Sequence, residues 1–290
     1  MTDFSQHAVL DLFAGSGVGV AIKQLGAREY GVEIMPEAIA TREANGMETI
    51  YNDVWEIEKA AGYAFDTLWA SPPCQTFSMA GRGEGRKALD NVLTTLEAGA
   101  WKSMPELRRW ATELGDERIG LVLTPLAYIY RYGPRYVAFE QVPPVLPVWE
   151  AMSDEMRKMG YSAWTGYLHS EQYGVPQTRK RAYLIAKRDP DWVASPPPVT
   201  HSKYHQRTPD RLDPGVRPWV SMAEALGWGM TERAYPTVST GASTSGGGTD
   251  PAALGGSGAR KFVYEQRDGG VDKQALRSNY GTGGDPAARG

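Results

Sequence analysis

The chain has very little cysteine: Cys74 is the only one among 290 residues. A single cysteine excludes a disulfide within the chain, and with it the small secreted proteins that disulfides hold together. The N-terminus lacks the apolar stretch of a signal peptide, and no apolar run is long enough to span a bilayer. The expected compartment is therefore the cytoplasm.

Histidine and excess charge are also scarce. Two of the four histidines, His201 and His205, have no cysteine or carboxylate at the spacing of metal ligands, so no metal site is predicted. The formal net charge of -3 argues against attraction of the whole molecule to a polyanion, although it does not exclude a local basic face. What is present, 41% hydrophobic and 22% charged residues, is the composition of a globular protein with a sizeable core.

Short apolar stretches alternate with stretches that favour helices over much of the chain. Strands are expected at residues 8–13, 29–34, 67–70, 137–139 and 182–186, and helices at residues 20–25, 36–40, 121–130 and 149–159. Strands that alternate with helices predict an α/β fold, with a largely parallel, Rossmann-like sheet that helices cover on both faces.

The composition changes after Arg188. Residues 195–198 read Ser-Pro-Pro-Pro, as in a linker, and residues 241–258 are rich in Gly, Ser and Thr. From about Ser239 onward the chain has too little apolar periodicity to form a core of its own. We therefore predict two domains, residues 1–188 with the sheet and residues 189–290 as a smaller, irregular region.

A glycine-rich turn follows the first expected strand. Gly15, Gly17 and Gly19 precede a helix-compatible stretch, which suits close approach of a ligand to the backbone. The spacing differs from the dinucleotide fingerprint and lacks the Lys-Ser/Thr of a phosphate loop. A turn that serves only the strand-to-helix geometry therefore stays an alternative.

Two acidic residues favour the ligand. Glu33 ends the second expected strand and Asp53 lies in a later turn, so both reach the carboxyl edge of a parallel sheet, where the glycine turn also lies. A carboxylate after the second strand suits the hydroxyls of a ribose. Asp53 suits an adenine amino group, and Ile34 suits its ring. The ordered set predicts a cofactor that contains a nucleoside.

Cys74 lies in a proline-bounded loop directly after the third expected strand. A thiol held there by Pro72 and Pro73 is rigid and open to a ligand, which favours a nucleophile. A cysteine used for packing usually lies within a periodic apolar run. From this loop alone, a buried and inert cysteine is an equal alternative.

Five motifs in one order extend this pattern. They are Asp11 to Gly17, Ser71 to Ser78 followed by Ala80-Gly81, Asp116-x-Arg118-x-x-Leu121, Glu140-Gln141-Val142, and Gln177-x-Arg179-x-Arg181. The set resembles the cytosine-5 DNA methyltransferase family, although Gln141 stands where that family usually has asparagine.

The resemblance implies S-adenosylmethionine as cofactor and a covalent reaction on DNA. A cytosine flips out of the duplex, the thiolate of Cys74 adds to its carbon 6, and a methyl group is transferred to carbon 5. Glu140 is expected to hydrogen-bond the base, Arg181 to reach its carbonyl oxygen, and Arg179 to support Glu140 or the nearby backbone. The residues implied in cofactor binding are Phe13, Ala14, Gly15, Gly17, Gly19, Glu33, Ile34, Asp53, Val54 and Pro73. Those implied in substrate binding are Gln75, Ser78, Arg82 and Gln177.

Besides Gln141, the chain departs from the family in two places. Residues 79–120 are longer than the family's usual loop, with a helical insertion expected at residues 101–114. The family's final motif is not found, so either the polypeptide is truncated or a second chain supplies that part. Residues 189–290 are the expected target-recognition region.

Three functions remain open from the sequence. The first is a DNA methyltransferase of a bacterium or a phage-infected host, with or without a restriction enzyme. The second is an RNA cytosine methyltransferase, because the family has a transfer RNA branch. The third is a non-catalytic DNA-binding or partner subunit. The Gly-rich, Arg-bearing second region favours double-stranded DNA modestly, and no membrane contact is expected.

Overall fold

The computed structural model describes residues 4–73, 77, 84–203, 214–222, 225 and 235–236. Contacts within the chain divide it into two units. One unit comprises Met1–Tyr167 and Arg181–Pro197, and the other comprises Leu168–Lys180 and Pro198–Gly290.

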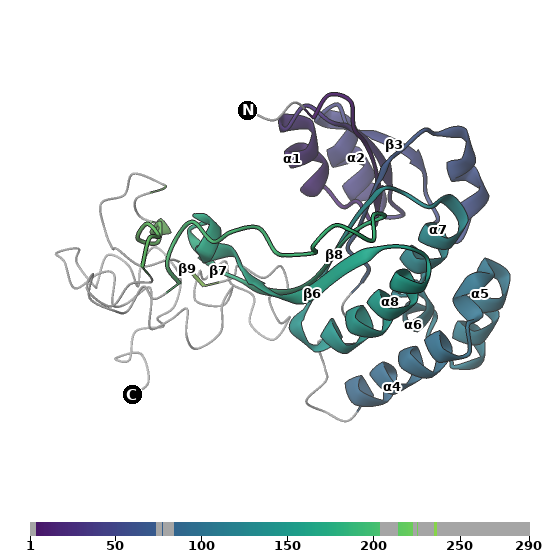
Figure 1. The fold of residues 1–290 in the computed structure, drawn as a ribbon. Coiled ribbons are helices and arrows are strands. Elements are labelled where there is room, and N and C mark those ends of the chain that lie inside the picture. The colour runs from purple at the N-terminus through teal and green to yellow at the C-terminus, as the bar shows by residue number, and fades with distance from the viewer. Residues whose placement is uncertain are drawn as a thin grey trace, which may run out of the picture. The chain divides into compact units, whose positions relative to one another are not determined.

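A seven-stranded sheet with helices on both faces dominates the first unit (Figure 1). The strands are β1 (Ala8–Leu12), β2 (Arg28–Val32), β3 (Glu48–Tyr51), β4 (Thr67–Ala70), β5 (Tyr136–Gln141), β6 (Ser162–His169) and β8 (Lys180–Lys187). The α-helices are α1 (Val18–Gln24), α2 (Pro36–Ala44), α4 (Glu84–Glu97), α5 (Met104–Glu113), α6 (Glu117–Leu121), α7 (Thr124–Tyr132) and α8 (Leu146–Lys158). Three short 3-10 helices, η1 (Ile57–Gly62), η3 (Ala100–Lys102) and η4 (Pro143–Val145), connect them.

The sheet has the strand order β3-β2-β1-β4-β5-β8-β6. Strands β1 to β5 all run parallel to one another, whereas β8 runs antiparallel to β5. The predicted α/β fold, with a largely parallel sheet and helices on both faces, is thus confirmed, and β8 makes the sheet a mixed one. Strands β3 and β6 were not predicted, because Glu48 to Tyr51 is short and mostly polar and Ser162 to His169 carries Gly166 and little apolar alternation.

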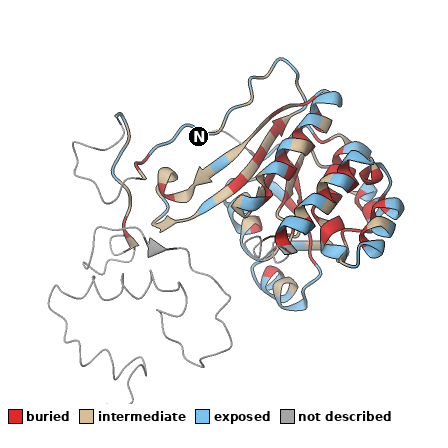
Figure 2. Cartoon of the chain, turned by 90° about the horizontal axis from the view of Figure 1, so that it is seen from below, coloured by how far each residue is buried: buried red, intermediate tan, exposed pale blue. Residues whose placement is uncertain are grey.

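Helices α4 to α8 cover one face of the sheet with the larger part of the core (Figure 2). On this face Phe139 of β5 packs against Trp149 of α8, with their ring centroids 5.5 Å apart. The indole nitrogen of Trp149 also donates to the carbonyl oxygen of Ala182 in β8, at 3.3 Å. Buried residues of β1, β4, β5 and β8 supply the rest of this core, so the face is apolar across these four neighbouring strands.

The opposite face carries a buried ion pair beneath α2. Arg42 of α2 donates from Nη2 to Glu29 Oε1 of β2 at 2.6 Å, and the two side chains are 0% and 4% exposed. Gly31, two residues along β2, leaves the space for it: a Cβ there would lie 1.9 Å from Arg42 Nη2. Arg42 also donates from Nε to Thr49 of β3. The pair therefore ties α2 to two neighbouring strands.

The second unit contains a small parallel pair, β7 (Gln177–Thr178) and β9 (Tyr235–Pro236), and the 3-10 helix η5 (Ser170–Tyr173). The backbone N–H groups of Thr200 and His201 both donate to the carbonyl oxygen of Gln172 at 3.0 Å, which joins the two stretches of chain that form the unit. Strand β9, the partner of β7, comes from residues 189–290, the region expected to be irregular. None of the helices that the structure describes combines the length and the apolar character needed to cross a membrane.

Candidate active site

The loops after β1 and β4 leave the sheet side by side. These strands are neighbours, but the chain continues from β1 toward β2 and from β4 toward β5, in opposite directions across the sheet. In open α/β sheets the carboxyl edge at such a reversal is where ligands bind. Ser71, the first residue after β4, donates its N–H to Leu12 O at 3.3 Å and its hydroxyl to Phe13 O at 3.4 Å. The glycine loop is therefore attached to the segment that leads to Cys74.

The glycine loop has an unusual backbone. Phe13 has a φ of 61°, the only positive φ of a non-glycine residue in the part of the chain that the structure describes. Gly15 has a φ of 53°, and a Cβ built on it would meet nothing within 4 Å. The turn thus needs glycine at 15 for its conformation, and it leaves open space beside the backbone there. Ala14 between them is buried, and its N–H donates to Val32 O of β2.

Glu33 is buried directly after β2 and accepts three backbone hydrogen bonds. Its Oε2 accepts from Gly15 N at 2.8 Å, and its Oε1 accepts from Ile34 N and Met35 N at 2.9 and 2.8 Å. The side chain therefore holds the glycine loop and its own turn in one arrangement. Each carboxylate oxygen offers about two acceptor positions, so Oε1 is fully used by these contacts and Oε2 keeps room for one more donor.

Apolar side chains are exposed beside this carboxylate. Ile34 is 65% exposed and Met35 is 58% exposed, unusual for large hydrophobic residues next to a buried glutamate. Asp53 lies on the next loop, where its Oδ1 accepts from Trp55 N at 3.0 Å. Val54 between them is buried, and its carbonyl oxygen accepts from the Tyr128 hydroxyl. The edge thus presents exposed apolar side chains, with a hydrogen-bonded carboxylate on each of the two loops.

The other two glycines of the turn differ from each other. Gly17 caps the N-terminus of α1, and a Cβ there would meet nothing within 4 Å. Gly19 lies inside α1, where a Cβ would be 2.7 Å from Met47 Sδ and 3.1 Å from Glu29 Cδ. Packing of α1 on the sheet therefore accounts for Gly19, and its predicted cofactor contact has no support in this geometry.

Glu140 and Arg181 form an ion pair at the same edge. Glu140 is paired with Tyr183 in the antiparallel register of β5 and β8, so Arg181 is its diagonal neighbour on the same face. Arg181 Nε lies 2.9 Å from Glu140 Oε1, and the two side chains are 19% and 16% exposed. Arg181 was expected at the base, and Arg179 at Glu140 or the nearby backbone; the structure shows Arg181 in contact with Glu140, and the two expected roles stay predictions.

Gln141 was not among the predicted site residues. Its buried side-chain amide donates from Nε2 to the carbonyl oxygen of Pro72 and accepts at Oε1 from Val142 N. It connects the end of β5 with the segment that follows β4. The one available signal was its departure from the asparagine usual in the resembling family.

Gln177 and Arg179 belong to the second unit. Gln177 is in β7, and Arg179 follows that strand. The N–H of Arg179 donates to buried Glu171 Oε2 at 3.3 Å, and its carbonyl oxygen accepts from Ser170 N at 2.9 Å. Its backbone is therefore held by η5.

The structure describes only one of the remaining predicted site residues. Pro73 is half-buried next to Pro72. Cys74, Gln75, Ser78 and Arg82 lie outside the described residues, so their roles stay predictions. Among the residues that are described, no three His, Cys, Asp or Glu side chains gather as metal ligands.

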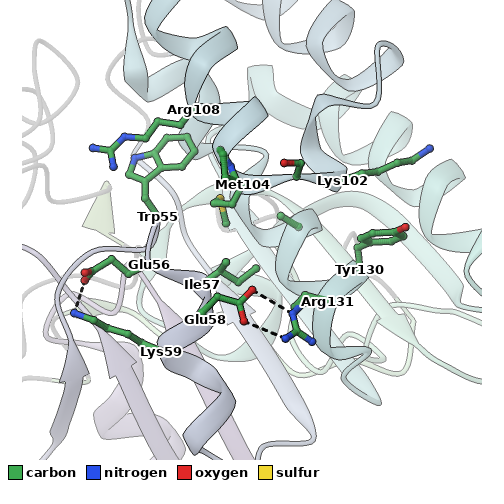
Figure 3. Close-up of a pocket in the computed structure, with 13 residues that line it drawn as sticks. Trp55, Glu56, Ile57, Glu58, Lys59, Lys102, Met104, Arg108, Tyr130 and Arg131 are labelled. Carbon is green, nitrogen blue, oxygen red and sulfur yellow. Dashed lines mark hydrogen bonds and ion pairs between the residues drawn. The ribbon is translucent and has the colours of Figure 1, made fainter.

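A hollow of about 990 Å³ lies on the helical layer of the first unit between η1, η3, α5 and α7 (Figure 3). Its charged groups are largely paired: Arg131 donates to both oxygens of Glu58 at 3.0 and 3.3 Å, and Lys59 donates to Glu56 at 2.7 Å. Arg108 lies over the ring of Trp55, 5.6 Å from its centroid. The expected helical insertion at residues 101–114 forms one wall, as η3 and α5.

Comparison with known proteins assigns the chain to a family. The model of the C-5 cytosine-specific DNA methylase matches residues 7–96 and 110–234, which is more than half of the chain. The chain therefore belongs to the family of C-5 cytosine-specific DNA methylases. The unmatched residues 97–109 lie within the long segment 79–120 and overlap the helical insertion expected at residues 101–114.

Three relatives illustrate the similarity. The type II methyltransferase M.AplI of Arthrospira platensis is 28% identical over 187 residues, which cover 63% of this chain and 46% of that protein. The orphan methyltransferase M.SPBetaI of Bacillus phage SPbeta is 25% identical over 205 residues, with coverage of 64% and 46%. Among solved structures, the S. pombe Dnmt2 methyltransferase is 18% identical with a TM-score of 0.47, covering 65% of this chain and 53% of that one. The chain spans about half the length of the curated relatives it matches.

Proposed function

We propose that the chain transfers a methyl group from S-adenosylmethionine to carbon 5 of a cytosine in double-stranded DNA, with Cys74 as the covalent nucleophile. One observation carries the proposal. Ser71 joins the loops after β1 and β4 by hydrogen bonds. Gln141 joins the loop after β4 by a hydrogen bond to the end of β5, which bears Glu140. A cofactor loop, a thiol and a carboxylate that belong to one reaction thus follow adjacent strands.

The cofactor edge fits a nucleoside with an amino acid attached. Glu33 Oε2 has acceptor capacity for a ribose hydroxyl, and exposed Ile34 offers an apolar surface for an adenine ring. The open space at Gly15 admits a ligand against the backbone. S-adenosylmethionine has no phosphate, which agrees with a glycine turn that lacks the features of a phosphate loop.

The chemistry assigns the chain's groups as follows. The thiolate of Cys74 forms a bond to carbon 6 of the flipped cytosine, and the electron pair of the 5,6 double bond becomes nucleophilic at carbon 5. Glu140, oriented by Arg181, accepts from the exocyclic amine of the ring, and its carboxyl in the protonated form donates to ring nitrogen 3, where negative charge develops. The bound cofactor supplies the methyl group. A base then removes the proton from carbon 5, the 5,6 double bond forms again, and the bond from carbon 6 to sulfur breaks to release the Cys74 thiolate.

The second unit is proposed to contact the DNA target. Arg179 and Gln177 belong to it, and the family's motif that contains them continues into β8 and Arg181. Relatives named as type II and orphan methyltransferases support modification of DNA, with or without a restriction enzyme.

Covalent trapping tests the proposal. The full chain is incubated with S-adenosylmethionine and a duplex library in which cytosines are replaced by 5-fluorocytosine, because fluorine cannot leave carbon 5 as a proton does. We expect a DNA adduct that survives denaturing electrophoresis and is absent for Cys74→Ser, while both proteins bind the cofactor equally in calorimetry.

The same assay separates the alternatives. An adduct with fluorocytosine RNA and none with DNA would replace the DNA proposal by the RNA one. Absence of an adduct with either nucleic acid, for the chain alone and with a C-terminal fragment of a relative added, would refute the enzyme.

A further inference from the structure

Gln141 lies where the ladder between β4 and β5 stops. The last paired residues are Ala70 of β4 and Phe139 of β5. Two residues further along each strand are Pro72 and Gln141, which would be opposite each other if the ladder continued. Proline has no N–H to donate, so the two strands separate at this point.

The side chain of Gln141 replaces the missing backbone contact. Its Nε2 donates to the carbonyl oxygen of Pro72, and its Oε1 accepts from the N–H of Val142. The side chain is only 4% exposed, so these bonds are not shared with bulk water. The two contacts also set the amide's orientation. Rotating it by 180° would place Oε1 against the carbonyl oxygen of Pro72 and Nε2 against the N–H of Val142, acceptor against acceptor and donor against donor.

The two residues on either side of this contact carry the proposed chemistry. Glu140 precedes Gln141 and projects from the opposite face of β5, as alternate residues of a strand do. Cys74 is two residues after Pro72. A group that fixes the Pro72 carbonyl relative to β5 therefore fixes the start of the thiol's loop relative to Glu140.

We infer that Gln141 is a positioning residue that fixes Pro72, two residues before Cys74 in the sequence, relative to Glu140. The inference rests on the proposed function, and it gives the replacement of the family's usual asparagine a physical reason. Asparagine is shorter by one methylene, so at this position we expect its amide to lose at least one of the two contacts with Pro72 and Val142. Gln141 itself touches neither base nor cofactor and acts through the two loops.

Three variants and one control test the inference. Gln141→Leu removes both hydrogen bonds at similar volume, Gln141→Asn keeps the amide and shortens it, and Gln141→Glu keeps the acceptor but loses the donor when ionised. Gln24→Leu, on the exposed surface of α1, is the control for replacing glutamine by leucine. Thermal unfolding followed by circular dichroism establishes which variants fold.

The first measurement is single-turnover methylation of DNA at saturating cofactor. We expect Gln141→Leu and Gln141→Asn to lower the rate by about 10- to 100-fold, the effect of misplacing a reacting group by about 1 Å. The Kd for S-adenosylmethionine should change by less than the rate, because Glu33, Ile34 and Asp53 lie on loops that the Gln141 side chain does not contact. Equal rates in all variants, with active wild type, would overturn the inference.

The second measurement needs no catalytic activity. Cys74 is the only thiol, so the rate of its alkylation by iodoacetamide reports its surroundings directly. For Gln141→Leu, we expect the alkylation rate to differ from that of wild type. For Gln141→Glu, we expect the ratio of variant to wild-type rates to return toward one as the pH falls, because a protonated carboxyl again donates to Pro72. A ratio of one throughout would refute the positioning role. Failure of wild type to methylate would refute the proposed function and leave this second test standing.

Discussion

The backbone N–H of Gly15 donates to Oε2 of Glu33 at 2.8 Å, which joins the loop after β1 to the loop after β2. The other oxygen of the same carboxylate holds Ile34 and Met35. One side chain therefore determines the shape of both loops at the proposed cofactor edge. A residue expected only to contact the ligand also builds the surface on which the ligand would lie.

Replacing Glu33 with glutamine should weaken the cofactor site more than its size suggests. The amide nitrogen of Glu33→Gln cannot accept a hydrogen bond, so either Gly15 or the pair Ile34 and Met35 loses its acceptor. We expect a loss of about 1–3 kcal/mol in the free energy of unfolding, and at least about tenfold weaker binding of S-adenosylmethionine in calorimetry. Glu37→Gln, on the exposed side of α2, controls for the lost charge. Unchanged affinity in Glu33→Gln would exclude Glu33 from the site.

The sequence was informative where one local pattern carried both conformation and chemistry. Gly15 and Glu33 could be predicted together because a glycine after one parallel strand and an acid after the next meet at the same edge. Gln141 could not, because its partner Pro72 is distant in the sequence and their contact depends on where two strands stop pairing.

Side-chain partners across the sheet were also beyond local reasoning. Arg42 appears in the sequence as one more charged helix residue, yet it is fully buried against Glu29. The contact between Arg181 and Glu140 was likewise not predicted. It follows from alternation along β8 and from the antiparallel register of β8 with β5.

The buried carboxyl of Asp11 should make stability depend on pH. Burial, and next the charge of Glu29, raise the pKa of Asp11 well above its usual value. The native state therefore holds this proton at pH values where the unfolded chain releases it, and wild-type stability falls as the pH rises through that interval. Asp11→Asn has no proton to release, so its free energy of unfolding should gain on that of wild type from about pH 4 upward.

Urea unfolding at several pH values measures this difference. Asp90→Asn, on the exposed surface of α4, provides the control for replacing an aspartate. A difference between Asp11→Asn and wild type that stays constant from about pH 4 to about pH 8 would contradict the raised pKa.

Gly31 should tolerate no side chain. A Cβ at this position would lie 1.9 Å from Arg42 Nη2, inside the buried pair with Glu29, so Gly31→Ala must displace the guanidinium. We expect a loss of about 1–3 kcal/mol in urea unfolding. Gly62→Ala is the matched control, because a Cβ there meets nothing within 4 Å. Equal stability of the two variants would mean that Arg42 is free to move aside.

Arg181 should be irreplaceable by lysine. The contact that orients Glu140 is made by Arg181 Nε, at 2.9 Å, from within a rigid planar group. Arg181→Lys keeps the charge but replaces that group with a flexible ammonium, so Glu140 loses its fixed orientation toward the base. We expect at least about tenfold slower single-turnover methylation, with unchanged binding of S-adenosylmethionine.

A control on the same strand separates orientation from charge. Lys187→Gln removes a cation from β8 by breaking its 2.8 Å pair with Asp189, at the end of the strand opposite to Arg181. Its methylation rate should equal that of wild type. If Arg181→Lys were as fast as Lys187→Gln, positive charge alone would suffice beside Glu140, and the fixed geometry of the ion pair would have no part in the reaction.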